Sequence, residues 1–148
     1  MPETLDVHAV RTPEERTAAM QLRWAILRAP LGLPPGSERD AEDETALLVV
    51  ACRSDGRVVG TGRLHPVDDG TGQIRYMAVA EDCRGQGVGA RLLAALEAAA
   101  LEQGLKRIVL NARENVAGFY ARFGYRQLAP GPLLYGKIPH LRMEKYLT

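Results

Sequence analysis

The stretch that decides the fold is DCRGQGVGARLLA, residues 82–94. Three glycines, Gly85, Gly87 and Gly89, stand at alternate positions directly before a segment with the leucine spacing of a helix. Each glycine costs about 0.5–1 kcal/mol relative to alanine wherever the backbone is held in one conformation. A glycine cluster at this point therefore predicts that a ligand approaches the main chain closely. Because a helix N-terminus carries free N–H groups and the positive end of the helix dipole, we expect that ligand to be an anion.

The segments on either side of this loop predict a strand, a helix and a second strand. Apolar residues dominate 73–80 and 105–112. The leucine-rich segment 87–103 lies between them and is followed by Gly104, a typical helix stop. Such a crossover places the glycine loop at the carboxyl end of the first strand and directs the helix N-terminus outward.

The rest of the chain predicts an α+β fold in a single domain, residues 1–148. A strand at 5–12 precedes a helix that begins after Thr12, with Pro13 at its first position. Two apolar runs joined by Asp55-Gly56 predict a hairpin. After the crossover we expect a short helix over 114–124, a strand at 125–129, a loop at 130–137 and a terminal edge strand at 140–147. That edge strand could add to a second copy and so form a homodimer.

Composition and charge exclude several classes of protein. The 148 residues are 46% hydrophobic and 25% charged, which is typical of a globular domain. A net charge of +1 and 5% aromatic residues give little basis for binding nucleic acid or a membrane. The polar N-terminal segment does not resemble a signal peptide, so we expect a cytoplasmic protein. The two cysteines and three histidines lack metal-ligand spacing, so we expect reduced thiols and no metal.

Three anionic ligands could explain the glycine loop. A Walker-type loop would need Gly-Lys-Ser/Thr, whereas this chain has Gly89-Ala90-Arg91. Gly85, Gly87 and Ala90 match the dinucleotide pattern G-x-G-x-x-G/A, which belongs to the first turn of a doubly wound sheet. Only about 60 residues follow this loop, too few for the remaining strands and helices of that fold. Coenzyme A is the third ligand.

Two motifs favour coenzyme A. Residues 84–89 have the form R/Q-x-x-G-x-G/A, and ENVAGFYARFGY, residues 114–125, fits N-x-x-x-x-Y-x-x-x-G-F/Y through Asn115, Tyr120, Gly124 and Tyr125. On both motifs, and in the order of elements over nearly the whole chain, the sequence resembles the GNAT superfamily of acyl-CoA-dependent N-acetyltransferases. The resemblance implies a mixed, mostly antiparallel central sheet with helices on both faces and one splayed strand pair.

The resemblance also implies a coenzyme site between the splayed strands. Met77, Ala78 and Val79 would offer main-chain groups to the pantetheine arm, and the Val79 N–H would be the oxyanion donor. Asn115 and Asn111 would contact the coenzyme, unless both are turn and cap residues. Tyr120 would contact the sulfur and act as general acid. The pyrophosphate would lie on Arg84, Gly85, Gln86, Gly87, Val88, Gly89 and Ala90.

The resemblance identifies the general base less clearly than the general acid. The family draws it from varied positions; His140, in KIPHLRM at the start of the last strand, is our candidate, ahead of His65. Cys83 raises the alternative of a covalent acyl-enzyme, but no Cys-His pair can be read from the sequence.

We therefore expect an N-acetyltransferase, an acyltransferase of groups other than aminoacyl groups. Acetyl-CoA would be its co-substrate, and a small-molecule or peptide amine its acceptor. The alternative is an acyl-CoA-binding sensor or interaction module of the same fold without catalysis. Residues 38–44 carry five acids and one arginine, which suits either a cationic acceptor or a solvated loop.

Overall fold

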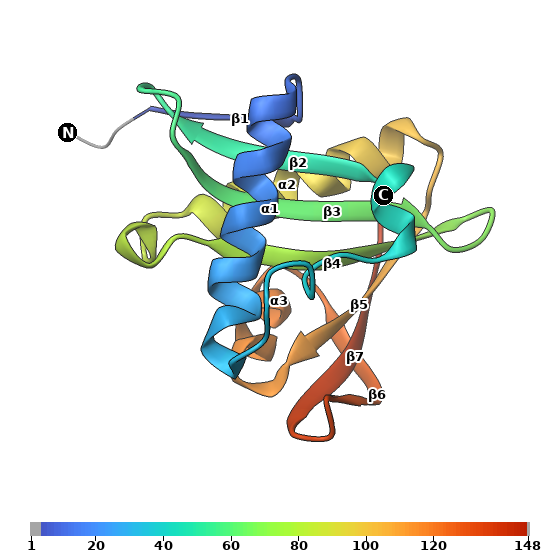
Figure 1. Ribbon diagram of the computed structural model, residues 1–148. Coiled ribbons are helices and arrows are strands. Elements are labelled where there is room, and N and C mark those ends of the chain that lie inside the picture. Colours follow the sequence, from blue (N-terminus) through green and yellow to red (C-terminus); the bar gives the residue numbers. More distant parts are fainter. Residues whose placement is uncertain (1–3, 148) are drawn as a thin grey trace.

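The strands of the chain form one mixed sheet in the computed structural model, which describes residues 4–147 (Figure 1). The spatial order of the strands is β1-β2-β3-β4-β5-β7-β6. Every neighbouring pair is antiparallel except β4 and β5, which are parallel. The strands span Leu5–Ala9 (β1), Leu47–Arg53 (β2), Val58–Pro66 (β3), Thr71–Val79 (β4), Arg107–Arg113 (β5), Arg126–Leu134 (β6) and Ile138–Tyr146 (β7).

Helices cover both faces of this sheet, as the sequence predicts. Helix α1 (Pro13–Leu27) lies on one face, and α2 (Val88–Glu102) and α3 (Ala117–Arg122) lie on the other (Figure 1). The N-terminus of α1 is capped where expected, because the Thr12 hydroxyl accepts a hydrogen bond from the Glu15 N–H at 3.0 Å. Short 3-10 helices occupy Ala29–Leu31, Ala41–Glu44, Glu81–Cys83 and Glu114–Val116.

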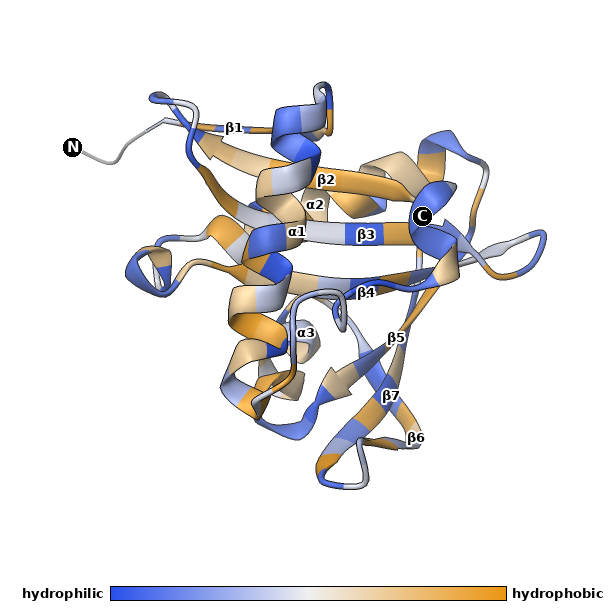
Figure 2. Ribbon diagram, viewed as in Figure 1, coloured by the Kyte–Doolittle hydropathy of each residue, from blue (hydrophilic) through white to orange (hydrophobic). Residues whose placement is uncertain are grey.

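The core lies on both sides of the central strands. Strand β2 is buried along its middle five residues and is apolar along most of its length (Figure 2). On the α2 side, Leu92, Leu93 and Leu96 are at most 1% exposed; on the α1 side, Ala19 and Met20 pack against β2. Within residues 4–147, no helix has both the length and the apolar character needed to cross a bilayer.

The C-terminal strands differ from the sequence expectation in two ways. Strand β6 continues to Leu134, so most of the expected loop 130–137 is strand. Its prolines, Pro130 and Pro132, lack an N–H but are tolerated because β6 is the edge of the sheet. Strand β7, expected at the edge, instead lies between β5 and β6. A homodimer formed through the last strand therefore loses its structural basis.

Strands β4 and β5 separate soon after they begin. Only Thr71–Gln73 of β4 pair with β5, at Arg107–Val109. Beyond these residues the two strands diverge. Between the partners Thr61↔Ala78 and Arg63↔Arg75, β4 has one more residue than β3, which is a β-bulge. Tyr76 lies in this bulge with φ of 59°. A bulge bends its strand and increases the local twist, so it accounts for the opening beside β4.

The strained conformation of Tyr76 is held by its side chain. A positive φ at a residue other than glycine costs about 1–3 kcal/mol, so neighbouring contacts have to stabilise it. The Tyr76 hydroxyl donates to Asp40 Oδ2 at 3.1 Å. The guanidiniums of Arg23, Arg75 and Arg63 lie 4.2, 4.6 and 4.8 Å from the ring centroid. Cation–π attraction therefore adds to the hydrogen bond in holding the bulge.

Candidate active site

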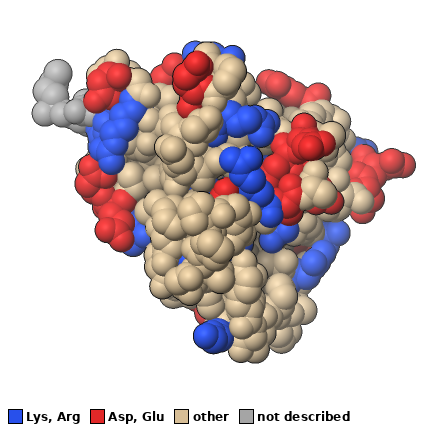
Figure 3. Space-filling view, in the orientation of Figure 1, with Lys and Arg blue, Asp and Glu red and all other residues tan. Residues whose placement is uncertain are grey.

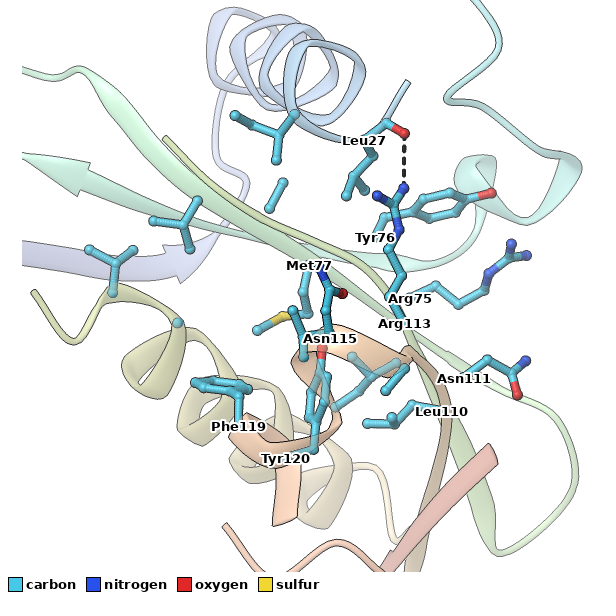
Figure 4. A pocket seen from close by; sticks show the side chains of 18 of the residues that line it. Leu27, Arg75, Tyr76, Met77, Leu110, Asn111, Arg113, Asn115, Phe119 and Tyr120 are labelled. Atoms are coloured by element: carbon cyan, nitrogen blue, oxygen red, sulfur yellow. Dashed lines mark hydrogen bonds between the residues drawn. The ribbon is translucent and has the colours of Figure 1, made fainter. Parts of the chain in front are cut away.

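A pocket of about 760 Å³ lies between the separated strands (Figure 4). It is lined by β4 and β5, by the glycine loop and α2, by α3, and by the C-terminal end of α1. Of the residues that the sequence assigned to the coenzyme, acid and leading base, all line it except Gln86, whose side chain accepts a hydrogen bond from Arg53 at 2.8 Å. The residues brought together are Met77, Ala78, Val79, Arg84, Gly85, Gly87, Val88, Gly89, Ala90, Asn111, Asn115, Tyr120 and His140.

The glycine loop leaves the start of α2 open. Gly85 and Gly87 adopt φ of 76° and 81°, the left-handed region that favours glycine, and a Cβ at either would meet nothing within 4 Å. Gly87 is the N-cap of α2 and has no side chain to cap the helix. The first-turn N–H groups of α2 therefore face the pocket side without a side-chain acceptor, which suits an anionic ligand.

The edge of β4 that faces the pocket also offers main-chain groups. The Ala80 N–H donates to the Val59 carbonyl of β3 at 2.9 Å. Consecutive N–H groups in an extended strand point to opposite edges, so the Val79 N–H points into the opening between β4 and β5. This direction agrees with the oxyanion role predicted for Val79.

Tyr120 lies on α3 with its hydroxyl end directed into the pocket, on the side of Asn115 (Figure 4). Its side chain is 7% exposed, and its ring packs edge-on against Phe119 at 5.1 Å between centroids. Burial raises the pKa of the Tyr120 phenol well above its ordinary value of 10. The phenol therefore stays protonated at neutral pH and can donate a hydrogen bond, but full proton release is disfavoured.

The two asparagines lie in different parts of the pocket. Asn115 lies between Met77 and Tyr120, whereas Asn111, on β5, points toward the side of Arg75 (Figure 4). The Asn111 Oδ1 is buried and has no hydrogen-bond partner within residues 4–147. Asn115 thus lies beside the predicted acid, and the coenzyme contact of Asn111 stays a prediction.

His140 is held in a defined orientation at the start of β7. Its Nδ1 lies 2.9 Å from the Ile138 carbonyl, which can only accept a hydrogen bond, so Nδ1 carries the proton. The lone pair of the neutral ring is therefore on Nε2, the atom that a general base needs. Gly131 of β6 packs against the His140 backbone, since a Cβ at Gly131 would lie 3.1 Å from the His140 carbonyl oxygen.

The other site alternatives lie apart from this arrangement. His65 contacts Arg63 at 3.4 Å and does not line the pocket; burial and the Arg63 charge lower its pKa. Cys83 lines the pocket but is fully buried, and its sulfur accepts from Arg53 at 3.0 Å. No histidine of residues 4–147 is hydrogen-bonded to Cys83, so the structure does not provide the base that a thiol nucleophile needs.

Far from the pocket, His8, Glu15 and Cys52 bring potential metal-ligand atoms within 4.8 Å of one another, which their sequence spacing did not indicate. His8 Nε2 already lies 2.9 Å from Glu15 Oε2, so these two groups satisfy each other by a hydrogen bond.

The acidic segment does not face the pocket. Asp43 is buried and accepts hydrogen bonds from Arg23 and Arg63, at 2.9 and 3.0 Å, while Asp40 bonds to Arg63, Arg75 and Tyr76. Burial acts to raise the pKa of both carboxyls, but their hydrogen bonds and the nearby guanidiniums lower it overall. These carboxylates hold α1 and the 3-10 helix Ala41–Glu44 to the sheet. Glu38, Asp40 and Asp43 are therefore engaged inside the fold, whereas Glu42 and Glu44 are exposed, so the expectation of a solvated loop holds only for those two acids.

Sequence reasoning missed the arginines on the α1 side of the pocket. Arg28, Arg75 and Arg113 line it, and no aspartate or glutamate is among its lining residues. The Arg113 guanidinium donates to the Leu27 carbonyl at 3.0 Å and so reaches the end of α1 (Figure 4). No motif indicated these residues, because arginines from α1, β4 and β5 converge only after folding.

Comparison with known proteins agrees with the geometry. The model of the acetyltransferase (GNAT) family matches residues 14–125. An uncharacterised N-acetyltransferase of Bacillus subtilis, YjcF, is 34% identical over 137 residues, 91% of this chain and 95% of the relative. A crystal structure of a Lactobacillus plantarum protein superposes with a TM-score of 0.87 at 27% identity, covering 98% of this chain and 99% of that one. An aminoglycoside 6'-N-acetyltransferase complexed with coenzyme A superposes with a TM-score of 0.80 at 18% identity, covering 95% and 96%.

Proposed function

This chain belongs to the GNAT family of acetyltransferases, and from that premise we propose that it moves an acetyl group from acetyl-CoA to an amine by direct transfer in a ternary complex. One observation carries the proposal. A single pocket combines the uncapped N-terminus of α2, the unpaired edge of β4 and the hydroxyl of Tyr120, which is directed into the pocket (Figure 4). These are the groups needed to hold a diphosphate, a thioester arm and a departing sulfur.

Coenzyme binding uses the glycine loop and β4. The α2 amides and the helix dipole attract the pyrophosphate, and Gly85 and Gly87 let it approach because they have no side chain. The pantetheine arm lies along β4 at Met77 and Val79. The Val79 N–H then donates to the thioester oxygen as negative charge develops there. One such donor is worth about 2.7–4 kcal/mol of barrier.

The acceptor has to lose a proton before or during attack. A lysine-like amine with a pKa near 10.4 is free in only about one molecule in 2,500 at pH 7, a cost of about 4.6 kcal/mol. His140 Nε2 takes that proton, and the Nδ1 bond to Ile138 keeps the ring in the required tautomer. The amine nitrogen forms a bond to the carbonyl carbon as the carbon–sulfur bond breaks.

Tyr120 stabilises the departing sulfur. The ordinary pKa of a phenol, about 10, already exceeds that of a thiol near 8.5, and burial raises the pKa of Tyr120 further, so complete transfer of its proton to the thiolate is uphill. Tyr120 therefore acts mainly as a hydrogen-bond donor to the developing thiolate. A protonated amine loses two protons in becoming an amide: the proton taken by His140 passes to solvent, and the proton lost as the amide forms ends on the thiolate, so coenzyme A leaves as a thiol.

A panel of amines tests this function against coenzyme binding without catalysis. Purified protein is mixed with acetyl-CoA and, separately, with amino acids, polyamines, aminoglycosides and peptide N-termini, and free coenzyme thiol is measured. We expect thiol release with at least one amine, and intersecting double-reciprocal lines as both substrates vary. Tight acetyl-CoA binding without thiol release from any amine would support a sensor instead. Parallel lines would indicate a covalent acyl-enzyme.

A further inference from the structure

Two arginines at the α1 end of the pocket lack a carboxylate partner. Arg28 is only 5% exposed and donates to the carbonyls of Ser37 and Leu27, at 3.3 and 3.2 Å. Arg113 donates to the same Leu27 carbonyl at 3.0 Å. Within residues 4–147 neither is within 4 Å of an aspartate or glutamate oxygen. Two cations thus share one carbonyl, although buried charges are normally paired.

The neighbouring acids are already neutralised by other arginines. Asp43 pairs with Arg23 and Arg63, and Asp40 pairs with Arg63 and Arg75. Glu38, which is also buried on this side, pairs with Arg39. Counting Arg28 and Arg113, six guanidiniums therefore stand against three carboxylates in this group of contacts. The Leu27 carbonyl belongs to the C-terminus of α1, whose dipole is equivalent to only about half a negative charge. Positive charge remains in excess at this end of the pocket.

The electrostatic state of Arg113 agrees with this imbalance. Burial lowers its pKa, and the charge of Arg28 lowers it further, with no acid acting in the opposite direction. The guanidinium remains protonated at neutral pH because arginine is effectively always charged in proteins. An anion placed between Arg28 and Arg113 would offset the desolvation cost of burying their charges and the repulsion between the two guanidiniums.

This positive end is distinct from the coenzyme phosphate site. Phe119 marks the phosphate side, since a Cβ at Gly89 in the first turn of α2 would lie 3.2 Å from its ring. Arg113 lies on the opposite side of Tyr120 and Asn115, next to the end of α1 (Figure 4). His140 is the register partner of Arg113 across β5 and β7. A group bound at Arg113 therefore lies on the side of the predicted base, where the acceptor has to approach.

From this arrangement we propose that the acceptor is an amine that also carries an anionic group, a carboxylate or a phosphate, which binds between Arg28 and Arg113. The proposal rests on the proposed transferase function and names its substrate class. The planar guanidinium fork matches the oxygens of either anion. Polyamines and other purely cationic amines are disfavoured, because they would bring positive charge to a site with an excess of it.

Binding of acetylated products tests the inference without requiring turnover. With free coenzyme A present, the protein is titrated by calorimetry with N-acetyl amino acids, their N-acetyl amino acid amides, N-acetylated 2-aminoethyl phosphate, N-acetylethanolamine and N-acetylputrescine. We expect at least one anionic product to bind at least tenfold more tightly than its neutral counterpart, and acetylputrescine to bind more weakly than either. Comparing the carboxylate and phosphate arms identifies the anion.

Matched variants assign the effect to the site. In Arg113→Gln the preference for the anion should fall to less than threefold, and Arg113→Lys should restore part of it. Arg28→Gln gives the same result if circular dichroism shows a native fold. Arg11→Gln is the control, because it removes the same charge from an arginine whose side chain is 62% exposed and which, among the described residues 4–147, forms an ion pair only with Asp6; it should keep the full preference.

The outcomes separate this inference from the proposed function. Equal affinity for acids and amides, binding of no anionic product, or an unchanged preference in Arg113→Gln would overturn the anion site. The anion site would also be overturned if Arg113→Gln lost affinity for coenzyme A but kept its affinity for the acetylated products, because Arg113 would then bind the coenzyme. Anion-selective binding with no thiol release from any amine would instead refute the transferase function alone.

Discussion

Substitution of Tyr120 by phenylalanine isolates the chemical step from the fold. Within residues 4–147 the Tyr120 hydroxyl makes no hydrogen bond, so its removal costs the folded state no bond. The ring keeps its contacts with Phe119 and Tyr125, whose centroids lie 5.1 and 5.8 Å away. We expect the stability to change by no more than about 0.5 kcal/mol, which moves Tm by about 2 °C or less in a domain of this size.

The effect on turnover should be much larger. Loss of a general acid or of its hydrogen bond lowers the rate about 10²–10⁴-fold, which corresponds to about 2.7–5.4 kcal/mol of barrier. The assay is release of coenzyme thiol at saturating acetyl-CoA, together with calorimetric titration of coenzyme A. Coenzyme affinity should stay within about threefold of the parent value, because the hydroxyl acts on charge that develops only during the reaction.

Tyr125→Phe is the matched control. Tyr125 is buried, and its hydroxyl donates to Glu97 Oε2 at 3.0 Å, outside the pocket lining. Its removal should lower stability by about 1.5–3 kcal/mol, the worth of a hydrogen bond to a charged group, and leave turnover nearly unchanged. If Tyr120→Phe keeps full turnover, or if both variants lose turnover equally, Tyr120 has no special part in the reaction.

Further changes test the rest of the site and its support. His140→Gln should lower turnover about 10²–10⁴-fold at unchanged coenzyme affinity, and unchanged turnover would remove it as the base. Gly131→Ala should also lower turnover, because its Cβ would lie 3.1 Å from the His140 carbonyl oxygen and would displace His140. Wild-type kinetics would show that β7 accommodates the methyl group without moving His140 out of position. Asp43→Asn should cost about 3–5 kcal/mol in urea unfolding, since it leaves the buried Arg23 without its carboxylate, while Arg63 keeps its pair with Asp40. Because the folded-state pKa values of Asp40 and Asp43 are lowered, their stabilisation is present above the unfolded value near 3.9 and is lost as pH falls below it, which acid titration of the unfolding free energy measures.

The sequence predicted the elements that carry local signals. The Thr12 cap, the Asp55-Gly56 hairpin, the glycine-opened helix and the crossover all appear where turn and capping chemistry indicated them. These features depend on residues that are neighbours in the chain, so a single sequence contains the information.

The missed features depend on contacts between distant segments. The place of β7 inside the sheet depends on its pairing with β5 on one side and with β6 on the other. The extension of β6 past its two prolines is tolerated because β6 is the edge strand. The fate of Asp43 depends on Arg23 and Arg63, 20 residues away on either side in the chain. The sequence of the acidic segment therefore suggested an acceptor site or a solvated loop, whereas Glu38, Asp40 and Asp43 are engaged inside the fold and only Glu42 and Glu44 are exposed. Acidic and basic residues lie side by side in the upper half of the face shown in Figure 3, and the net charge is only +1, so net charge alone could not reveal the local excess near Arg113.

Calorimetric titration of coenzyme A into the parent protein, Gly87→Glu and Gly104→Glu tests most directly whether the start of α2 holds the coenzyme. Gly87 and Gly104 have φ of 81° and 79°, and a Cβ at either meets nothing within 4 Å, so the two variants carry similar backbone strain at opposite ends of one helix. The account predicts that Gly87→Glu abolishes coenzyme binding while Gly104→Glu keeps the parent affinity. Equal affinity in all three proteins would contradict it.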